Sequence, residues 1–498
     1  MKSNNTKKLK PIMFVGTGSD VGKSVINAAF CRILKQDGYS PAPFKAQNMS
    51  LNSYATPEGL EIGRAQAVQA EACGIDCNTD MNPVLLKPTN DKTCQVILNG
   101  KPIGNQTASE YFLQTDREIL FQEALKAFER LAKNYNPVVM EGAGSISELN
   151  LWAKDITNMR IALATGASVF LVTDIDRGGI FGSVYGTILL LPEEERRHIK
   201  GVIINKFRGD IALFLDGKQI LEKLTGIPVV GIIPWFKDIH IDDEDSVALH
   251  GKNKSIENAS LKIAVVLLYH MSNFTDFNAL ERLPEVHLFY ASQPNELHNA
   301  DIIIIPGSKN TIADLIYLRQ SGMAKAILEA HANDKSIFGI CGGYQMMGES
   351  IHDPYNIEGS VSAISGLNIL PVTTIISKEK VTEQQKFTFL SESPVCSGYE
   401  IHMGETTSAK SSPLCRKLDG TEDGYFLNTK TWGTYMHGIF DNEIIINNIF
   451  ETHFVTGRVQ QQNYSAYKEE QYDKLASLIR KNCDMEYIYS AIIPLDPI

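Results

Sequence analysis

The chain has 498 residues, of which 43% are hydrophobic and 21% charged, the composition of a globular protein with two or three domains. Its formal net charge of −11 argues against a nucleic-acid or membrane-surface partner. We expect no membrane span, because no apolar run approaches the ~20 residues needed, and the apolar stretch 11–15 is too short for a signal peptide. Eight scattered cysteines without a CxxC pair favour a reducing cytoplasm.

A glycine-rich segment follows the first expected strand, 12–15, and leads into an expected helix that runs to residue 35. The segment reads Gly16-Thr-Gly-Ser-Asp-Val-Gly22-Lys23-Ser24. Strand, glycine-rich loop and helix in this order predict a phosphate-binding loop, in which Lys23 adds a charge and Ser24 can ligate Mg²⁺. The spacing of the two glycines resembles the dethiobiotin synthetase branch of P-loop proteins, which activate carboxylates with ATP. The expected ATP-binding residues of this loop are Gly18, Asp20, Val21, Gly22, Lys23 and Ser24.

Further buried runs, ending near residues 44, 140, 173, 204 and 233, predict the other strands of a parallel sheet. Lys45 follows one of these strands and is placed to contact a transferring phosphate. Glu141 stands at the carboxyl end of another, where a carboxylate beside a phosphate loop suits Mg²⁺. A further carboxylate ligand is expected, and Glu61 and Asp20 are candidates.

Two aspartates one residue apart follow the strand at 169–173, in Asp174-Ile-Asp176-Arg177-Gly-Gly. Their side chains point to the same face of an extended segment. They either cap a helix that begins near Ile180 or belong to a substrate site.

The segment from Ala46 to Tyr54 is rich in amides and hydroxyls, which is typical of a solvent-exposed connection. Its sequence, with 63–67 and 81–88, also resembles the signature segments of the cobyric acid synthase family. The resemblance implies that Asn205 contacts adenine. It also implies a set of residues that contact an acid substrate, namely Gln47, Asn48, Asn52, Tyr54, Asp174, Asp176 and Arg177.

A second α/β unit begins near residue 262, after an acidic and polar stretch that is typical of an interdomain linker. We expect a disordered tail (1–10), a P-loop amidoligase domain (11–236), a linker (237–260), an amidotransferase domain (261–450) and a C-terminal helical extension (451–498).

Cys341 ends the apolar run 336–340 and is followed by two glycines and a helix-forming segment. This pattern predicts a nucleophile elbow, although a buried structural cysteine is the alternative. His437, in Tyr-Met-His-Gly, is a candidate base or else a packed histidine. On the expected strand 398–404, Glu400 and His402 share a face and are either surface groups or part of the same pocket.

These two motifs together resemble the class I glutamine amidotransferases, which have a flavodoxin-like fold and release ammonia from glutamine. The segment 301–310 resembles the oxyanion strand of that family, which implies oxyanion contacts from the N–H groups of Gly307 and Gly342. Most members carry a glutamate two residues after the histidine, but here that position is Ile439. The corrinoid-amidating subgroup is similar in lacking this glutamate, so we expect a Cys341–His437 dyad. The sequence leaves open which group orients the imidazole.

The two expected sites suit one reaction, in which ATP converts a carboxylate to an acyl phosphate and ammonia attacks it. The resemblance implies an amidoligase acting on the b, d, e and g carboxylates of adenosylcobyrinic acid a,c-diamide. It implies a need for ATP and Mg²⁺, no prosthetic group, and corrinoid and glutamine as the other small-molecule partners. Two alternatives are the related a,c-diamide synthase and, from another class, a partitioning-type nucleotide-switch ATPase. The sequence leaves open the oligomeric state and whether an ammonia tunnel joins the two sites.

Overall fold

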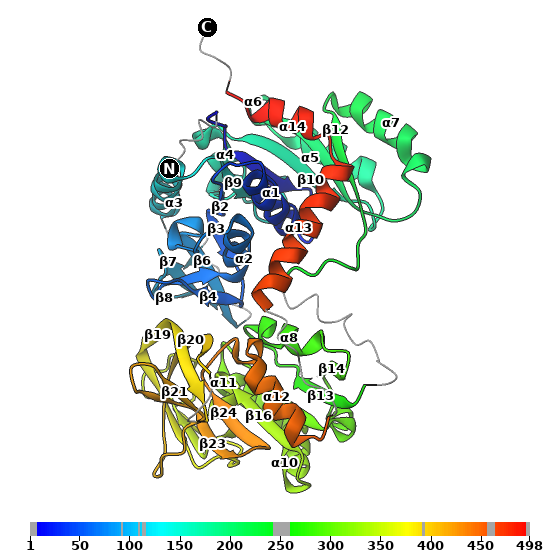
Figure 1. Ribbon diagram of the computed structural model, residues 1–498. Helices are drawn as coiled ribbons and strands as arrows, with labels where there is room; N and C mark the ends of the chain where they lie inside the picture. Colours follow the sequence, from blue (N-terminus) through cyan, green and yellow to red (C-terminus); the bar gives the residue numbers. More distant parts are fainter. Residues whose placement is uncertain are drawn as a thin grey trace, which may run out of the picture.

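The computed structural model describes residues 7–90, 93–107, 110–111, 116–242, 259–390, 394–455 and 464–494. Two α/β domains are stacked on each other (Figure 1), which confirms the expected fold class. Residues 1–6 of the expected tail and 243–258 of the expected linker lie outside the described residues. Within the expected tail, Leu9 is buried and the N–H of Lys10 donates to the carbonyl of Ile492 at 2.7 Å.

The first domain is built on a six-stranded parallel sheet in the order β12-β11-β10-β1-β9-β2. Its strands are continuous buried runs, as expected for a parallel sheet covered on both faces. The bounds are β1 (Ile12–Gly16), β2 (Ala42–Phe44), β9 (Val138–Glu141), β10 (Ser168–Asp174), β11 (Ile199–Phe207) and β12 (Val229–Pro234).

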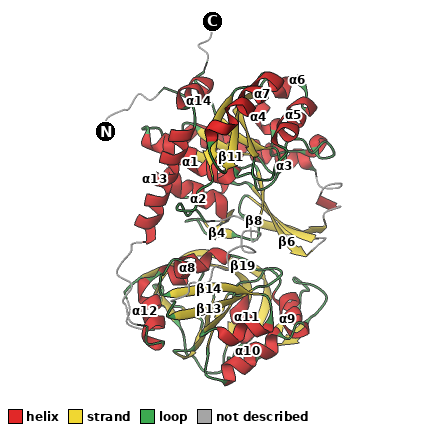
Figure 2. Ribbon diagram, turned by 90° about the vertical axis from the view of Figure 1, so that its right-hand side faces the viewer, coloured by secondary structure: helices red, strands yellow, loops and turns green. Residues whose placement is uncertain are grey.

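Helices surround this sheet (Figure 2). They are α1 (Lys23–Gln36), α2 (Arg64–Cys73), α3 (Arg117–Asn134), α4 (Met159–Thr165), α5 (Ile180–Leu190), α6 (Glu193–Arg196) and α7 (Leu215–Thr225). Helix α1 begins directly after Gly22, whose φ of 96° lies in the left-handed region that favours glycine. The glycine therefore allows the sharp change of direction from loop to helix.

A smaller four-stranded sheet lies on the side of the first domain that faces the second (Figure 2), in the order β3-β6-β7-β8. Its strands are β3 (Gln47–Met49), β6 (Val84–Asn90), β7 (Thr93–Leu98) and β8 (Lys101–Thr107). A separate pair, β4 (Ser53–Ala55) and β5 (Glu61–Gly63), lies beside it. The segment from Ala46 to Tyr54 is thus folded into two short strands and carries buried side chains, unlike an exposed connection.

The second domain has a six-stranded sheet in the order β14-β13-β15-β16-β24-β23, parallel except for β23. The strands are β13 (Leu261–Val266), β14 (Val286–Ala291), β15 (Ile302–Ile305), β16 (Ser336–Ile340), β23 (Tyr425–Asn428) and β24 (Thr431–Thr434). Its helices are α8 (Asn278–Glu281), α9 (Thr311–Gln320), α10 (Met323–Ala332), α11 (Gly342–Met347) and α12 (Glu443–Thr452).

A second sheet of this domain is dominated by the long antiparallel pair β19 (Thr373–Phe389) and β20 (Cys396–Thr407). Its other strands are β17 (Ser350–His352), β18 (Ala363–Ser365), β21 (Cys415–Lys417) and β22 (Glu422–Asp423). The pair β19 and β20 reaches the boundary with the first domain (Figure 1).

The C-terminal helices α13 (Tyr464–Asn482) and α14 (Met485–Ile492) return to the first domain (Figure 1). Leu475 and Ile479 of α13 are buried in one core cluster with Phe30 of α1. The guanidinium of Arg32 on α1 donates to Asp473 and Glu469 of α13, each at 2.7 Å. Residues from the N-terminal and the C-terminal parts of the chain therefore pack together in the core of the first domain.

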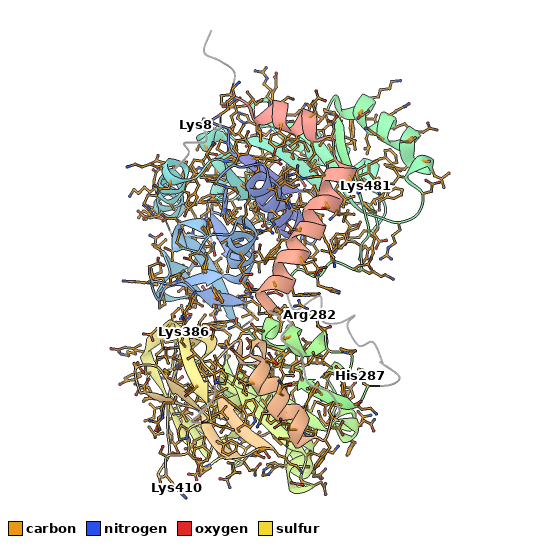
Figure 3. The ribbon with its side chains drawn as sticks, in the orientation of Figure 1. Lys8, Arg282, His287, Lys386, Lys410 and Lys481 are labelled. Atoms are coloured by element: carbon orange, nitrogen blue, oxygen red, sulfur yellow. The ribbon has the colours of Figure 1, made fainter. Side chains whose placement is uncertain are left out.

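The two domains are also joined by buried ion pairs and aromatic contacts. Asp242 binds Arg64 of the first domain and Asn278 of the second, each at 2.8 Å. Figure 3 shows Arg282 at this boundary, where its guanidinium lies 5.1 Å from the ring of Tyr464. Over the residues that the structure covers, every helix is too short or too polar to cross a lipid bilayer.

Candidate active sites

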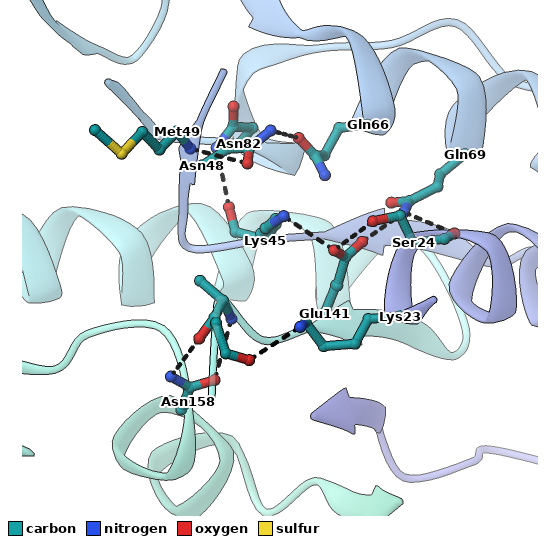
Figure 4. Close-up of polar contacts among 12 residues, drawn as sticks. Lys23, Ser24, Lys45, Asn48, Met49, Gln66, Gln69, Asn82, Glu141 and Asn158 are labelled. Carbon is teal, nitrogen blue, oxygen red and sulfur yellow. Dashed lines mark hydrogen bonds and ion pairs between the residues drawn. The ribbon is translucent and has the colours of Figure 1, made fainter. Parts of the chain in front are cut away.

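The phosphate loop and the side chains around it meet at the carboxyl end of the first parallel sheet (Figure 4). Lys23, at the start of α1, is buried, and its ammonium donates to the carbonyls of Gly18 and Gly144, each at 2.9 Å. These carbonyls hold the lysine over the loop, where it can contact a phosphate.

Glu141, at the end of β9, is the centre of the polar contacts in this site. Its Oε1 accepts hydrogen bonds from Ser24 Oγ at 2.8 Å and Lys45 Nζ at 2.9 Å, and its Oε2 accepts one from Gln69 Nε2 at 2.7 Å. A hydroxyl and a carboxylate side by side on a phosphate loop are the hard oxygen ligands that Mg²⁺ prefers. Ser24 and Glu141 are therefore suited to hold Mg²⁺ with the phosphates of a nucleotide.

Two amides near Glu141 were not predicted from the sequence. Gln69 comes from α2, and Asn158 holds the segment after Glu141 by pairing with both the N–H and the carbonyl of Ala143 at 3.1 and 3.0 Å. Isolated Gln and Asn residues give no local signal of such a role. Glu61, a candidate Mg²⁺ ligand in the sequence analysis, instead pairs with Lys87 and Lys380 at the domain boundary.

Asn205 and the Asp174–Arg177 segment lie on the other side of the phosphate loop. Asn205 Nδ2 donates to the carbonyl of Val21 at 2.9 Å, so this residue contacts the loop itself. Arg177 NH2 lies 3.4 Å from Asp20 Oδ2 and its Nε lies 3.6 Å from Asp174 Oδ2. Asp174 is also paired with Lys206 at 3.0 Å, and Asp176 with Arg208 at 2.6 Å. These charged side chains therefore lie beside the phosphate loop and are paired with one another.

The other predicted substrate residues are divided between two places. Asn48 donates to Gln66 Oε1 at 3.1 Å near the phosphate site (Figure 4), and Gln47 Oε1 accepts from the hydroxyl of Tyr111 at 2.5 Å. Asn52 is buried and its carbonyl accepts from the N–H of Arg64 at 3.1 Å. Tyr54 points instead into the domain boundary, where its ring lies 4.7 Å from that of Tyr399.

Cys341 occupies a sharp turn between β16 and α11 in the second domain. Its φ of 51° is unusual for a residue with a side chain, and backbone strain of this kind is often found at functional sites. The adjacent glycines leave room for the turn, since a Cβ on Gly342 would lie 2.8 Å from the N atom of Ser308. This geometry is that of a nucleophile elbow.

Gly307 and Gly342, the predicted oxyanion residues, are brought together around the elbow. Gly307 follows β15, and a Cβ placed on it would lie 3.3 Å from Cε1 of His437. Gly342 is the first residue of α11. The two glycines and the imidazole thus surround the position next to the Cys341 thiol, where an oxyanion and a leaving nitrogen can be bound.

His437 is buried and is oriented by Asp276, a residue that the sequence analysis did not select. Its Nδ1 lies 2.7 Å from Asp276 Oδ2, and Asp276 Oδ1 accepts from the N–H of Gly438 at 2.9 Å. Burial lowers the pKa of the imidazole, but Asp276 and the neighbouring Cys341 raise it to about 10. The sequence analysis left open which group orients the imidazole, and in the structure the carboxylate that contacts it is that of Asp276.

Aromatic rings cover the outer side of the imidazole. The ring of Tyr399 stacks on His437 with centroids 5.2 Å apart, and Tyr54 of the first domain contacts the edge of Tyr399. Beside them, Ser53 of the first domain donates its N–H to Asn273 Oδ1 at 3.0 Å. The first domain therefore contacts Tyr399, which stacks on His437, and Asn273, which lies three residues before Asp276.

A cavity of about 60 Å³ lies beside Cys341 and is lined by both domains. Cys341, Gln345, His402 and Lys380 belong to the second domain. Residues 87, 89, 95 and 105 belong to the small sheet of the first domain. His402 thus lines the pocket, while Glu400 pairs with Lys417 at 2.6 Å.

Comparison with protein families assigns both domains. Residues 12–247 match the model of the CobQ/CobB/MinD/ParA nucleotide-binding domain. Residues 262–444 match that of the CobB/CobQ-like glutamine amidotransferase domain. These matches agree with the phosphate loop of the first domain and the nucleophile elbow of the second.

Relatives are similar to the chain over nearly its whole length. A protein of Parabacteroides distasonis named cobyric acid synthase is 61% identical, with 97% of this chain and 99% of the relative covered. Proteins of the same name from Bacteroides fragilis and Phocaeicola vulgatus are 58% and 57% identical, with 98% and 97% of this chain and 100% and 98% of the relatives covered. With both catalytic domains and this degree of identity, the chain belongs to the cobyric acid synthase family of glutamine-dependent amidoligases.

Proposed function

We propose that this chain amidates the b, d, e and g side-chain carboxylates of adenosylcobyrinic acid a,c-diamide, with ATP and glutamine as co-substrates. The observation that carries this proposal is the identity of 61% to a protein named cobyric acid synthase, over 97% of the chain. The two candidate sites supply the two half-reactions that such an amidation needs.

Ammonia would be released at Cys341. The thiolate attacks the side-chain amide carbon of glutamine, and the N–H groups of Gly307 and Gly342 stabilise the oxyanion. The imidazolium of His437 gives its proton to the departing nitrogen, which leaves as neutral ammonia. His437 then takes a proton from the water that hydrolyses the thioester, and Asp276 keeps the imidazole in the required tautomer and orientation.

The carboxylate would be activated at the phosphate loop. A carboxylate oxygen of the corrinoid attacks the terminal phosphate of ATP, which gives an acyl phosphate and ADP. Lys23 and Lys45 provide positive charge for the transferring group, and Ser24 and Glu141 would hold Mg²⁺. Bound there, Mg²⁺ neutralises charge on the phosphates. Ammonia then attacks the acyl carbon and displaces phosphate.

The corrinoid would be bound beside the phosphate loop. We assign its contacts to Gln47 and Asn48 on one side and to Asp174, Asp176 and Arg177 on the other, because these side chains flank the loop. Asn205, which contacts the loop backbone, is assigned to the nucleotide. Asn52 and Tyr54 would support this site from the domain boundary. We assign the amidoligase activity to residues 11–236 and the amidotransferase activity to residues 261–450, the bounds expected from the sequence.

The test is mass spectrometry of the corrinoid after incubation with protein, ATP, Mg²⁺ and a nitrogen source. The wild-type protein should add four amide groups with either glutamine or a high concentration of ammonium chloride. Cys341→Ala should lose the reaction with glutamine and keep the reaction with ammonium. Cys396→Ala, a substitution of another buried cysteine, is the matched control and should retain both. If Cys341→Ala loses both reactions equally while remaining folded, the two-site proposal fails.

A further inference from the structure

Asp314, on helix α9, is a buried carboxylate that the glutaminase steps described above do not use. Its Oδ2 accepts a hydrogen bond from the hydroxyl of Ser308 at 2.6 Å and one from the N–H of His270 at 3.2 Å. Its Oδ1 lies 2.8 Å from Nδ1 of His270. The side chain of Asp314 is fully buried. A carboxylate that has left water is stabilised only through such contacts, so it holds its partners in fixed places.

The first partner of Asp314, Ser308, belongs to the turn that carries one side of the oxyanion hole. Ser308 follows Gly307, whose N–H is assigned to the oxyanion. The Ser308 hydroxyl also accepts from the N–H of Asn310 at 3.0 Å, so it links the turn to the start of α9. A Cβ on Gly342 would lie 2.8 Å from the N atom of Ser308, so the peptide between Gly307 and Ser308 lies directly against the elbow. The contact with Asp314 therefore acts one residue away from an oxyanion donor.

The second partner, His270, begins the segment that carries the acidic partner of the base. The backbone of residues 270–272 pairs with that of residues 307–309 as a short antiparallel ladder, whose hydrogen bonds are 2.9 and 3.0 Å long. The same segment continues to Asp276, whose carboxylate contacts Nδ1 of His437. The buried carboxylate on α9 thus contacts both sides of the ladder, and so both segments that build the glutaminase site around the elbow.

Helix α9 gives this carboxylate a firm support. Ile312 and Leu315 of the helix are buried in the core of the second domain. The helix also has a cap of its own, because Asn310 Oδ1 accepts from the N–H of Ala313 at 3.1 Å. Since the start of the helix is already capped, the contacts of Asp314 serve the turn and the segment that it joins.

We propose that Asp314 is a positioning residue that aims the N–H of Gly307 at the oxyanion. It acts through its contacts with Ser308 and His270. This inference rests on the proposed function, in which this N–H stabilises the charge that develops on the glutamine oxygen. An oxyanion donor is effective only at the right place, and a misplacement of about 1 Å can cost about 10²-fold in rate. Because that charge is absent from bound glutamine, loss of Asp314 should lower kcat and leave KM for glutamine nearly unchanged.

The first test measures glutamate release by Asp314→Asn and Ser308→Ala. We expect kcat to fall about 10²-fold in Asp314→Asn and about tenfold in Ser308→Ala, with KM for glutamine within about twofold of the wild-type value. Ser321→Ala is the matched control, because this serine follows the other end of α9, where its hydroxyl donates to the carbonyl of Leu318 at 3.3 Å. The control should retain the wild-type kcat.

An unchanged kcat in both folded variants, or a rise in KM with kcat unchanged, would overturn the proposal. If Asp314→Asn does not fold, the comparison of Ser308→Ala with Ser321→Ala decides.

The second test asks whether the loss lies in the oxyanion hole. Iodoacetamide alkylates Cys341 by displacement of iodide, a reaction that needs the thiolate but forms no oxyanion. Peptide mass spectrometry should therefore give the wild-type rate of alkylation at Cys341 in both variants. A slowing of alkylation equal to the fall in kcat would show that the thiolate or its base is disturbed instead, and the proposal would fail.

The third test combines the two substitutions in one protein. If Asp314 acts through Ser308, the double variant should be no slower than Asp314→Asn alone, because the contact between the two side chains is already lost there. Fully additive effects on kcat would show that the two residues act independently, which contradicts the proposed link.

These outcomes are separate from a failure of the proposed function. A wild-type protein that releases no glutamate from glutamine would contradict the proposed function itself. An active wild-type protein with equally active variants would overturn the positioning role of Asp314 alone.

Discussion

Nδ1 of His437 lies 2.7 Å from Oδ2 of Asp276, although 161 positions of sequence separate the two residues. Both atoms are buried, and the second oxygen of Asp276 binds the N–H of Gly438, so the carboxylate holds the imidazole and the adjacent backbone together. Asp276 therefore contacts the imidazole of His437 in a chain where position 439 is an isoleucine. The carboxylate reaches the imidazole from the segment that follows β13, at the boundary with the first domain.

Asp276→Asn should lower the glutaminase rate by about 10²–10⁴, because an amide neither stabilises the imidazolium nor fixes the tautomer of His437. Amidation with ammonium should be retained, since the phosphate site is untouched. The measurement is glutamate release together with corrinoid mass spectrometry. Asp419→Asn, in an exposed turn, is the control. A variant with wild-type glutaminase activity would show that Asp276 has no role in orienting the base.

Glu141→Gln should abolish amidation with both nitrogen sources, because the amide removes a negative charge from the expected Mg²⁺ site and from Lys45. We expect a fall of at least about 10²-fold in amidation with ammonium, which higher Mg²⁺ relieves in part. Glu148→Gln in the exposed part of the same segment is the control. Cys341 should still react with a glutamine-analogue alkylating agent, which would show that the second domain is intact. Normal ATP turnover by Glu141→Gln would contradict the placement of the site.

The raised pKa of His437 predicts a loss of stability at alkaline pH. The unfolded imidazole loses its proton near pH 6.5, whereas the folded one keeps it up to about pH 10. Protonation of His437 therefore contributes stability fully below pH 6.5, and this contribution declines as the pH rises towards 10.

Between about pH 7 and pH 9.5 the wild-type protein should lose at least ~1.4 kcal/mol more stability than His437→Gln, the equivalent of one unit of pKa. Thermal unfolding at several pH values measures this difference. Parallel curves for the two proteins would contradict it.

Leu475→Ala should destabilise the first domain by about 2–5 kcal/mol, because Leu475 of α13 is fully buried in its core. The loss should appear in the unfolding transition that ATP stabilises, although the residue lies near the end of the chain. Lys474→Ala, at an exposed neighbouring position, should leave that transition unchanged. An effect confined to the transition of the second domain would show that α13 belongs there.

The strands and the two motifs could be predicted from the sequence because their signals are local. A glycine-rich loop or a cysteine followed by two glycines brings its functional residue to the end of a strand within a few positions. Lys23 and Cys341 belong to this class. The buried runs also gave β1, β9, β10 and β16 to within about two residues.

Asp276 and Glu61 show why the rest could not be predicted. Asp276 meets His437 only because β13 and β24 belong to the same sheet, and no spacing in the sequence records this. Glu61 was one of two candidates for a further carboxylate ligand of Mg²⁺. The domain packing instead places Lys380, more than three hundred positions away, against its carboxylate.

The return of α13 and α14 to the first domain fixes the order in which the protein can be completed during synthesis. The ribosome makes the core residues Phe14 and Phe30 first, but their partners Leu475 and Ile479 only after the whole second domain. Domains usually fold as units from the N-terminus onwards during translation. Here the nucleotide-binding half cannot complete its core until the glutamine-binding half has been made. Until then, one side of α1 is uncovered. A chain released before α13 is made would therefore lack the residues that complete the core around α1 of the ATP-binding half.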